Sequence, residues 1–102
     1  MDDDKLIAAI ISETRKEHRI PPYCDDETMK NYALQGDSEL ERYVVIRDYD
    51  NDLTARMLLK NYILYAFNSI ANEFHVNYAD TLFSWQMSKV KGVDDDETSD
   101  IQ

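Results

Sequence analysis

Three aspartates at alternate positions are the first candidates for chemistry in this chain. Asp48, Asp50 and Asp52 reproduce the opening of a calcium-binding loop, in which alternate carboxylates converge on one hard cation. The rest of that motif is missing, because Leu53 stands where the loop needs glycine and Leu59 stands where it needs a bidentate glutamate. The sequence therefore favours a solvated loop whose polar residues cap the following helix, with Asp50 or Asn51 as the expected cap.

The other residue types of metal and nucleophilic sites are isolated from one another. His18 and His75 lie far apart and Cys24 has no second thiol, so no zinc-ligand spacing is present. Three acidic residues follow Cys24 and disfavour a reactive thiolate, which leaves partly buried packing as the favoured interpretation. Gly36 and Gly92 stand alone, so no glycine-rich phosphate loop exists. We expect no catalytic residue, metal ligand or cofactor, and a protein that is not an enzyme.

Acidic residues outnumber basic ones and gather toward the ends of the chain. Across 102 residues, 21 Asp and Glu face 11 Lys and Arg, and the formal net charge is -10. Asp2 to Asp4 and Asp94 to Glu97 supply much of this charge. Tight nucleic-acid binding is disfavoured, because it requires clustered Lys and Arg. The acidic start is also unlike a signal peptide, and no run of about 20 apolar residues predicts a membrane span.

The elements that carry these residues are predicted to be helices. Two Gly and two Pro are too few for the turns of a many-stranded sandwich or barrel. Apolar residues recur at helical spacing and predict an all-α, compact four-helix bundle in one domain, residues 1–92. The four helices are expected at about residues 3–18, 26–45, 52–75 and 80–91. Residues 93–102 lack periodicity and predict a disordered, flexible acidic tail.

Two features predict how the helices pack. Gly36 lies inside the second predicted helix, where glycine costs roughly 1 kcal/mol relative to alanine. Close approach of another helix and a tolerated defect both account for it. The third predicted helix is apolar nearly all round, which predicts burial on several sides and an uncovered face that meets a second subunit.

Several stretches of the chain resemble the head-tail connector family of tailed bacteriophages. They are Ile20 to Met29, Tyr32 to Gly36 with Leu40, Asp48 to Asn68, and then Phe74, Asn77, Tyr78 and Leu82. The resemblance spans roughly residues 5–90, and its most characteristic part is the acidic loop that runs into the Ala55 to Ala66 segment. It implies a helical subunit, about twelve copies of which form a ring beneath the portal protein. Such a ring extends the DNA channel and provides the docking site for the stopper or tail.

The resemblance also implies which residues make contacts. It places the contact with the portal, or with neighbouring copies, in the C-terminal segment: Trp85, Met87, Lys89, Val90, Lys91 and Val93. Asp48, Asp50 and Asp52 are candidate channel-facing acids, because a carboxylate-lined lumen repels DNA phosphates over roughly 8 to 10 Å. DNA is expected to pass without specific binding. The expected location is the head-tail interface of the virion, after assembly in the bacterial cytoplasm.

Two other functions remain open from the sequence. A DNA-mimic inhibitor is also small, helical and acidic, but it needs carboxylates spaced along a folded surface rather than gathered in terminal runs. A small helical regulator that binds one host partner is compatible with the composition. The three hypotheses differ in whether the protein assembles with copies of itself.

Overall fold

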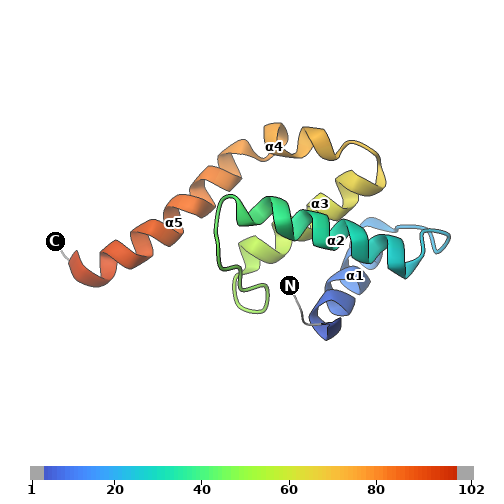
Figure 1. Ribbon diagram of the computed structural model, residues 1–102, viewed down its shortest axis with the longest axis horizontal. Coiled ribbons are helices and arrows are strands. Elements are labelled where there is room, and N and C mark those ends of the chain that lie inside the picture. The colour runs from blue at the N-terminus through green and yellow to red at the C-terminus, as the bar shows by residue number, and fades with distance from the viewer. Residues whose placement is uncertain (1–3, 99–102) are drawn as a thin grey trace.

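The computed structural model describes residues 4–98, with side chains placed for residues 4–90 (Figure 1). All regular structure in this part of the chain is helical, which confirms the all-α part of the predicted fold class. In chain order the elements are α1 (Asp4–His18), α2 (Asp26–Glu41), α3 (Leu53–Phe67), the 3-10 turn η1 (Ala71–Glu73), α4 (Phe74–Asn77) and α5 (Ala79–Thr98).

The helices form a compact body and a projecting arm (Figure 1). α1, α2 and α3 pack against one another, and η1 and α4 lead the chain from the end of α3 to α5. α5 then runs away from the body, and the molecule measures 54 × 29 × 20 Å along its principal axes. Of the four helices predicted to form a bundle, three make the body, whereas the fourth contributes only its beginning.

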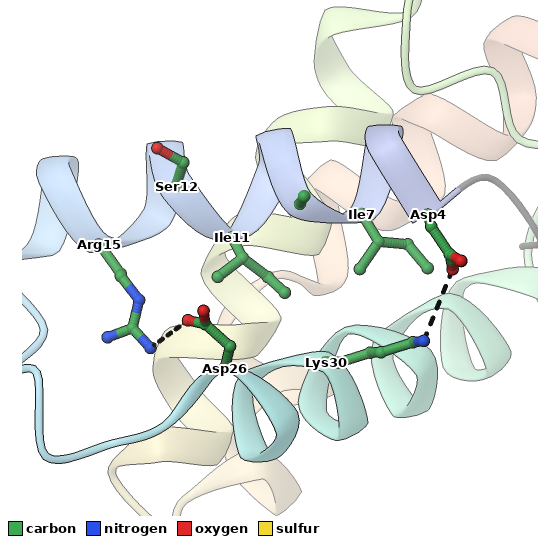
Figure 2. A pocket seen from close by; sticks show the side chains of 8 residues that line it. Asp4, Ile7, Ile11, Ser12, Arg15, Asp26 and Lys30 are labelled. Atoms are coloured by element: carbon green, nitrogen blue, oxygen red, sulfur yellow. Dashed lines mark hydrogen bonds and ion pairs between the residues drawn. The ribbon is translucent and has the colours of Figure 1, made fainter.

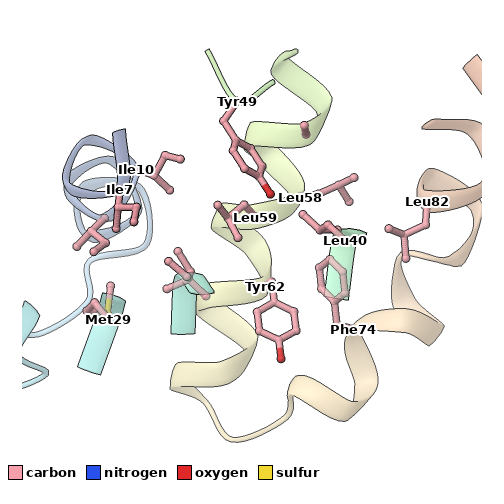
Figure 3. Close-up of a cluster of buried hydrophobic side chains, with 14 of the residues drawn as sticks. Ile7, Ile10, Met29, Leu40, Tyr49, Leu58, Leu59, Tyr62, Phe74 and Leu82 are labelled. Atoms are coloured by element: carbon pink, nitrogen blue, oxygen red, sulfur yellow. The ribbon is translucent and has the colours of Figure 1, made fainter. Parts of the chain in front are cut away.

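The core lies between the three long helices and is closed at one end by the segment from η1 to α5 (Figure 3). Its largest fully buried side chains come from α1, α2, α3, α4 and α5, and each is under 2% exposed: Ile10, Thr14, Met29, Leu40, Leu58, Leu59, Ile63, Phe74 and Leu82. α3 contacts α1, α2 and η1, as its apolar sequence predicts. Leu53, its first residue, is exposed.

Gly36 lies where α2 crosses α3. A Cβ atom at this position would come within 2.7 Å of Leu59 Cδ1 and 2.8 Å of Tyr62 Cδ1. Real Cβ atoms essentially never approach other atoms that closely. Close approach of another helix is therefore the correct interpretation of this glycine.

The first and third helices end by the same mechanism. Arg19 and Ser69 adopt positive φ values of 53° and 63°, and each is followed by an amide that bonds back into the helix. Ile20 N donates to Arg15 O at 3.2 Å, and Ile70 N donates to Tyr65 O at 2.9 Å, which is the Schellman pattern. α1 therefore ends at His18 as predicted, but α3 ends at Phe67 and not at about residue 75. The residues predicted to extend it form η1 and α4 instead.

Two other helix ends differ from the prediction. α2 ends at Glu41 rather than at about residue 45, because Tyr43 N and Val44 N both turn back to Leu40 O. α5 continues through Gly92 to Thr98, so residues 93–98 of the predicted tail have helical backbone. The last four residues of that tail, 99–102, lie outside the described part of the chain.

Candidate interaction surface

The carboxylate of Asp52 joins the arm to the body. Its Oδ1 caps α3 by accepting from Thr54 N at 3.1 Å and Ala55 N at 3.2 Å. Its Oδ2 accepts from Trp85 Nε1 at 2.9 Å and lies 2.7 Å from Lys89 Nζ, and both of these residues belong to α5. We call the contact of Asp52 with Trp85 and Lys89 the arm clasp. The helix cap is thus Asp52, and the predicted cap at Asp50 or Asn51 is wrong.

The environment of Asp52 keeps its carboxylate ionised. Burial alone would raise its pKa, but the hydrogen bonds from Lys89 and Trp85 outweigh burial and lower the pKa below its ordinary value. An ionised carboxylate has acceptor sites for all four donors at once. The clasp is therefore complete at neutral pH.

The arm clasp gives α5 two faces of different character. Leu82 and Trp85 are buried against the body, whereas Phe83, Met87 and Val90 are 61%, 36% and 49% exposed. These three residues have i, i+4, i+7 spacing and form one apolar stripe, which we call the arm stripe. At about 100° per residue, the arm stripe lies roughly 150° around α5 from the face that makes the clasp.

The connection between α2 and α3 is held in place by a buried ion pair. Arg47 Nε and Nη2 donate to the two oxygens of Asp37 at 2.9 and 3.1 Å, and Tyr49 Oη donates to Asp37 at 2.5 Å. Burial would raise the pKa of Asp37, but the bonds from Arg47 and Tyr49 lower it. Burial and the Asp37 carboxylate raise the pKa of Tyr49. The network fixes the backbone on both sides of Arg47.

This fixed connection presents apolar side chains to solvent. Val45 is 72% exposed and Ile46 is 84% exposed, and we call these two residues the loop patch. Arg47 Nη1 donates to the carbonyl oxygens of Val44 and Val45, so the loop patch sits on a braced backbone. The exposed Leu53 begins the helix that follows. The two adjacent exposed side chains on this braced turn make it a candidate contact surface.

The three candidate acids do not converge on one point. Asp48 closes its own turn by accepting from the amides of Asp50 and Asn51, both at 3.2 Å, and from Asn51 Nδ2 at 3.0 Å. These bonds, led by the one from the Asn51 side chain, lower the pKa of Asp48. Asp50 is largely exposed and lies 3.9 Å from Arg56. The described residues hold no group of three side chains placed to bind a metal ion.

The predicted contact residues divide between the two faces of the arm. Met87 and Val90 lie on the exposed arm stripe. Trp85 and Lys89 instead contact the body through Asp52, so Trp85 is not presented to a partner. The side chains of Lys91 and Val93 lie outside the described part of the chain. The sequence interpretation missed Phe83 and the loop patch as surface residues.

A groove between α1 and α2 is a second candidate site (Figure 2). It has a volume of about 390 Å³ and an apolar floor made by Ile7, Ala8 and Ile11. An ion pair lies toward each end, Arg15 with Asp26 at 2.9 Å and Lys30 with Asp4 at 3.5 Å (Figure 2). These paired charges join the two helices, and the isoleucines of the floor belong to the core. The groove is explained by packing of the body.

His75 belongs to the one histidine network that the described side chains form. Its Nδ1 lies 2.8 Å from Tyr43 Oη, and its Nε2 lies 3.0 Å from Glu39 Oε1. The His75 ring also stacks on Tyr43 and meets the edge of Phe74. These contacts attach α4 to the end of α2. They brace the turn from which the arm starts.

Comparisons of the chain with protein-family models, with curated proteins and with solved structures find no match. Among the helices of the described residues, none is long and apolar enough to cross a membrane.

Proposed function

We propose that this protein is a structural assembly protein, the head-tail adaptor of a tailed bacteriophage. About twelve copies form a ring beneath the portal protein, extend the DNA channel and provide the docking site for the stopper or tail. The protein acts by packing and not by catalysis. The observation that carries this proposal is the arm, a helix that leaves a compact body with an apolar stripe exposed.

An arm of this kind suits assembly. The body has its own core and the clasp fixes the direction of α5, so the arm is presented to a partner without rearrangement. The sequence resemblance to head-tail connectors adds an independent reason to assign the partners as the portal and neighbouring copies. Assembly takes place in the bacterial cytoplasm, and the final location is the virion.

The acidic residues fit a conduit that DNA must traverse without adhering. Asp48 and Asp50 are exposed, and although Asp50 lies 3.9 Å from Arg56, both carboxylates are presented at the surface. A lumen lined with such groups repels phosphate over roughly 8 to 10 Å. We assign Asp48 and Asp50 to the channel wall, while Asp52 serves the clasp.

The exposed arm stripe also suits a small helical regulator that binds one host protein. That function predicts a complex of one copy with one partner and no ring. A DNA mimic is less well supported, because Glu13, Asp37 and Asp52 are engaged by basic side chains of the same chain.

The test is to mix the protein with the portal protein of the same phage and to image the product by electron microscopy. A ring-shaped collar on the portal is the expected result. The disrupting variant is Val90→Asp, which places a charge on the arm stripe and is expected to weaken or abolish the collar. Absence of any portal complex across salt concentrations and pH values would overturn the proposal.

A further inference from the structure

Two exposed surfaces lie at opposite ends of α2. Residues 21–24, which we call the tyrosine turn, precede this helix, and the loop patch follows it (Figure 1). Because α2 has 16 residues, the two surfaces are about 24 Å apart and do not touch within one molecule. Two different surfaces on one chain can join identical copies head to tail, which closes into a ring when the rotation allows it.

The tyrosine turn is braced by an arginine, as the loop patch is. Cys24 N donates to Pro21 O at 3.2 Å, and Arg15 Nη2 donates to Cys24 O at 2.5 Å. Tyr23 lies between the two bonded residues and is 81% exposed. A tyrosine on a rigid backbone supplies a large contact area at a small entropic cost, and tyrosines often dominate the energy of an interface.

Unpaired positive charge lies beside the tyrosine turn. Among the described side chains, Lys16 and Arg19 are the only lysine and arginine that make neither an ion pair nor a hydrogen bond. Both are exposed, and Arg19 lies two residues before Pro21. The dipole of α1 favours cations at this end of the helix but leaves their charge exposed. The tyrosine turn therefore combines an aromatic ring with unpaired cations.

Unpaired negative charge lies beside the loop patch. The described carboxylates that make no ion pair or hydrogen bond are Glu27, Glu41, Glu73 and Asp80. Three of them lie at helix starts, where the dipole favours an acid: Glu27 in α2, Glu73 before α4 and Asp80 in α5. Glu41 instead ends α2, where the dipole opposes a carboxylate, and it lies four residues before Val45. A cation from another molecule would stabilise Glu41.

Charge selects a second copy as the molecule that covers each surface. The tyrosine turn offers an aromatic ring and unpaired cations, whereas the loop patch offers two aliphatic side chains and an unpaired acid. Two tyrosine turns in contact would bring cations together, and two loop patches would bring acids together. Opposite charge therefore favours turn against patch over either symmetric contact.

We infer that the tyrosine turn of one copy packs on the loop patch of a neighbouring copy. Tyr23 then covers Val45 and Ile46, and Arg19 pairs with Glu41 of the neighbouring copy. This inference rests on the proposed function, since it names a contact that repeats around the ring. It leaves the acids assigned to the channel wall and the arm stripe free for their own roles.

Charge reversal tests the pairing of Arg19 with Glu41. Arg19→Glu and Glu41→Arg are each expected to weaken self-association in sedimentation at least about tenfold, because each places like charges across the contact. The double variant is expected to regain native self-association, since it restores the pair with the signs exchanged. Both positions are exposed, so the variants are expected to keep the native far-ultraviolet circular dichroism.

Glu73→Arg is the matched control for the charge reversal. It makes the same change as Glu41→Arg at an exposed, unpaired position that belongs to neither surface, and it is expected to leave self-association unchanged. Equal weakening by Glu73→Arg and Glu41→Arg, or no recovery in the double variant, would contradict the pairing. Loss of portal binding in Arg19→Glu with native self-association would show that the portal covers the tyrosine turn, which also overturns the inference.

Cysteine cross-linking locates the contact. Cys24 is the only native thiol and is first replaced by Cys24→Ala. Pro22→Cys and Ile46→Cys are then made separately at these exposed positions, with an affinity tag on one of them, and Tyr23 is kept in both. Mixing the two under mild oxidation is expected to give at least about tenfold more mixed dimer than either variant forms with itself, because a disulfide needs Cα atoms within about 7 Å.

The cross-linking outcomes separate the possible contacts. Dimers of either variant with itself, at the same yield as the mixture, would indicate a symmetric contact and overturn the inference. Absence of mixed dimers, both in the concentrated free protein and with the portal present, would also overturn it.

Failure of the inference and failure of the proposed function give different results. A collar on the portal without the mixed cross-link leaves the adaptor function standing and refutes this contact. Mixed cross-links without a collar support the contact and refute the portal adaptor. If neither is found, both proposals fall.

Discussion

Asp52→Ala is expected to release the arm and to destabilise the body. The substitution removes the cap of α3, which costs about 1 kcal/mol, and leaves the buried Trp85 N–H without an acceptor, which costs about 1 to 3 kcal/mol. The Lys89 ion pair adds little, about 0 to 1 kcal/mol, because the Lys89 side chain is 46% exposed. The expected loss in the free energy of unfolding is therefore about 2 to 5 kcal/mol.

The single tryptophan allows the release of α5 and the unfolding of the whole protein to be measured separately. Trp85 is the only tryptophan of the chain and is buried in the clasp, so its emission reports the docking of α5. Circular dichroism at 222 nm reports total helix. In Asp52→Ala the emission is expected to shift to longer wavelength at lower urea than the loss of helix, whereas in the native protein the two transitions should lie closer together.

Lys89→Met is the matched control. It removes the ion pair and leaves both carboxylate oxygens of Asp52 in place, so the helix cap and the bond from Trp85 remain. The expected cost is below about 1 kcal/mol, with native emission. The explanation is refuted if Asp52→Ala keeps both the native emission and the native urea midpoint, or if Asp52→Ala and Lys89→Met are equally unstable.

Three further substitutions test the body of the molecule. Gly36→Ala is expected to lower the free energy of unfolding by about 1 to 2 kcal/mol, because overpacking against α3 outweighs the gain in helix propensity. Urea unfolding measures this loss, and comparison of Gly and Ala at the exposed position 35 measures the helix-propensity contribution alone. A Gly36→Ala protein that is more stable than the native protein contradicts the prediction. Glu13→Gln is expected to lower the free energy of unfolding by about 1 kcal/mol at neutral pH. The hydrogen bond from Arg56 lowers the pKa of Glu13 from 4.5 to about 2. The loss of stability is therefore fully present above pH 4.5 and fades as the pH falls toward 2. Urea midpoints of both proteins across that range check the sign, and a cost independent of pH would refute it. Ser69→Gly is expected to stabilise by about 0.5 to 1 kcal/mol, because its φ of 63° suits glycine, while Ser69→Ala gives no such gain in thermal unfolding.

The sequence predicts most of the body because its signals are local. Apolar spacing places α1 to within one residue at each end, and Gly36 indicates the crossing with α3. The early end of α3 is not predicted, because Ser69 adopts a left-handed conformation without the glycine that usually marks one. The turn after α2 is held by the bond from Arg47 to Asp37, a contact between residues ten positions apart that helical spacing does not indicate. Local patterns thus predict helices better than their ends.

The arm shows why only part of the candidate site is readable from the sequence. Leu82, Phe83, Trp85, Met87 and Val90 all support a helix, but at about 100° per residue they occupy two faces, so some of them must leave the core. Which face is covered is decided by Asp52, 33 positions before Trp85 and at the start of another helix. No periodicity within residues 79–98 contains that information. The exposed arm stripe is therefore a consequence of the clasp, and a variant that weakens the clasp should alter assembly even though Asp52 itself need not touch a partner.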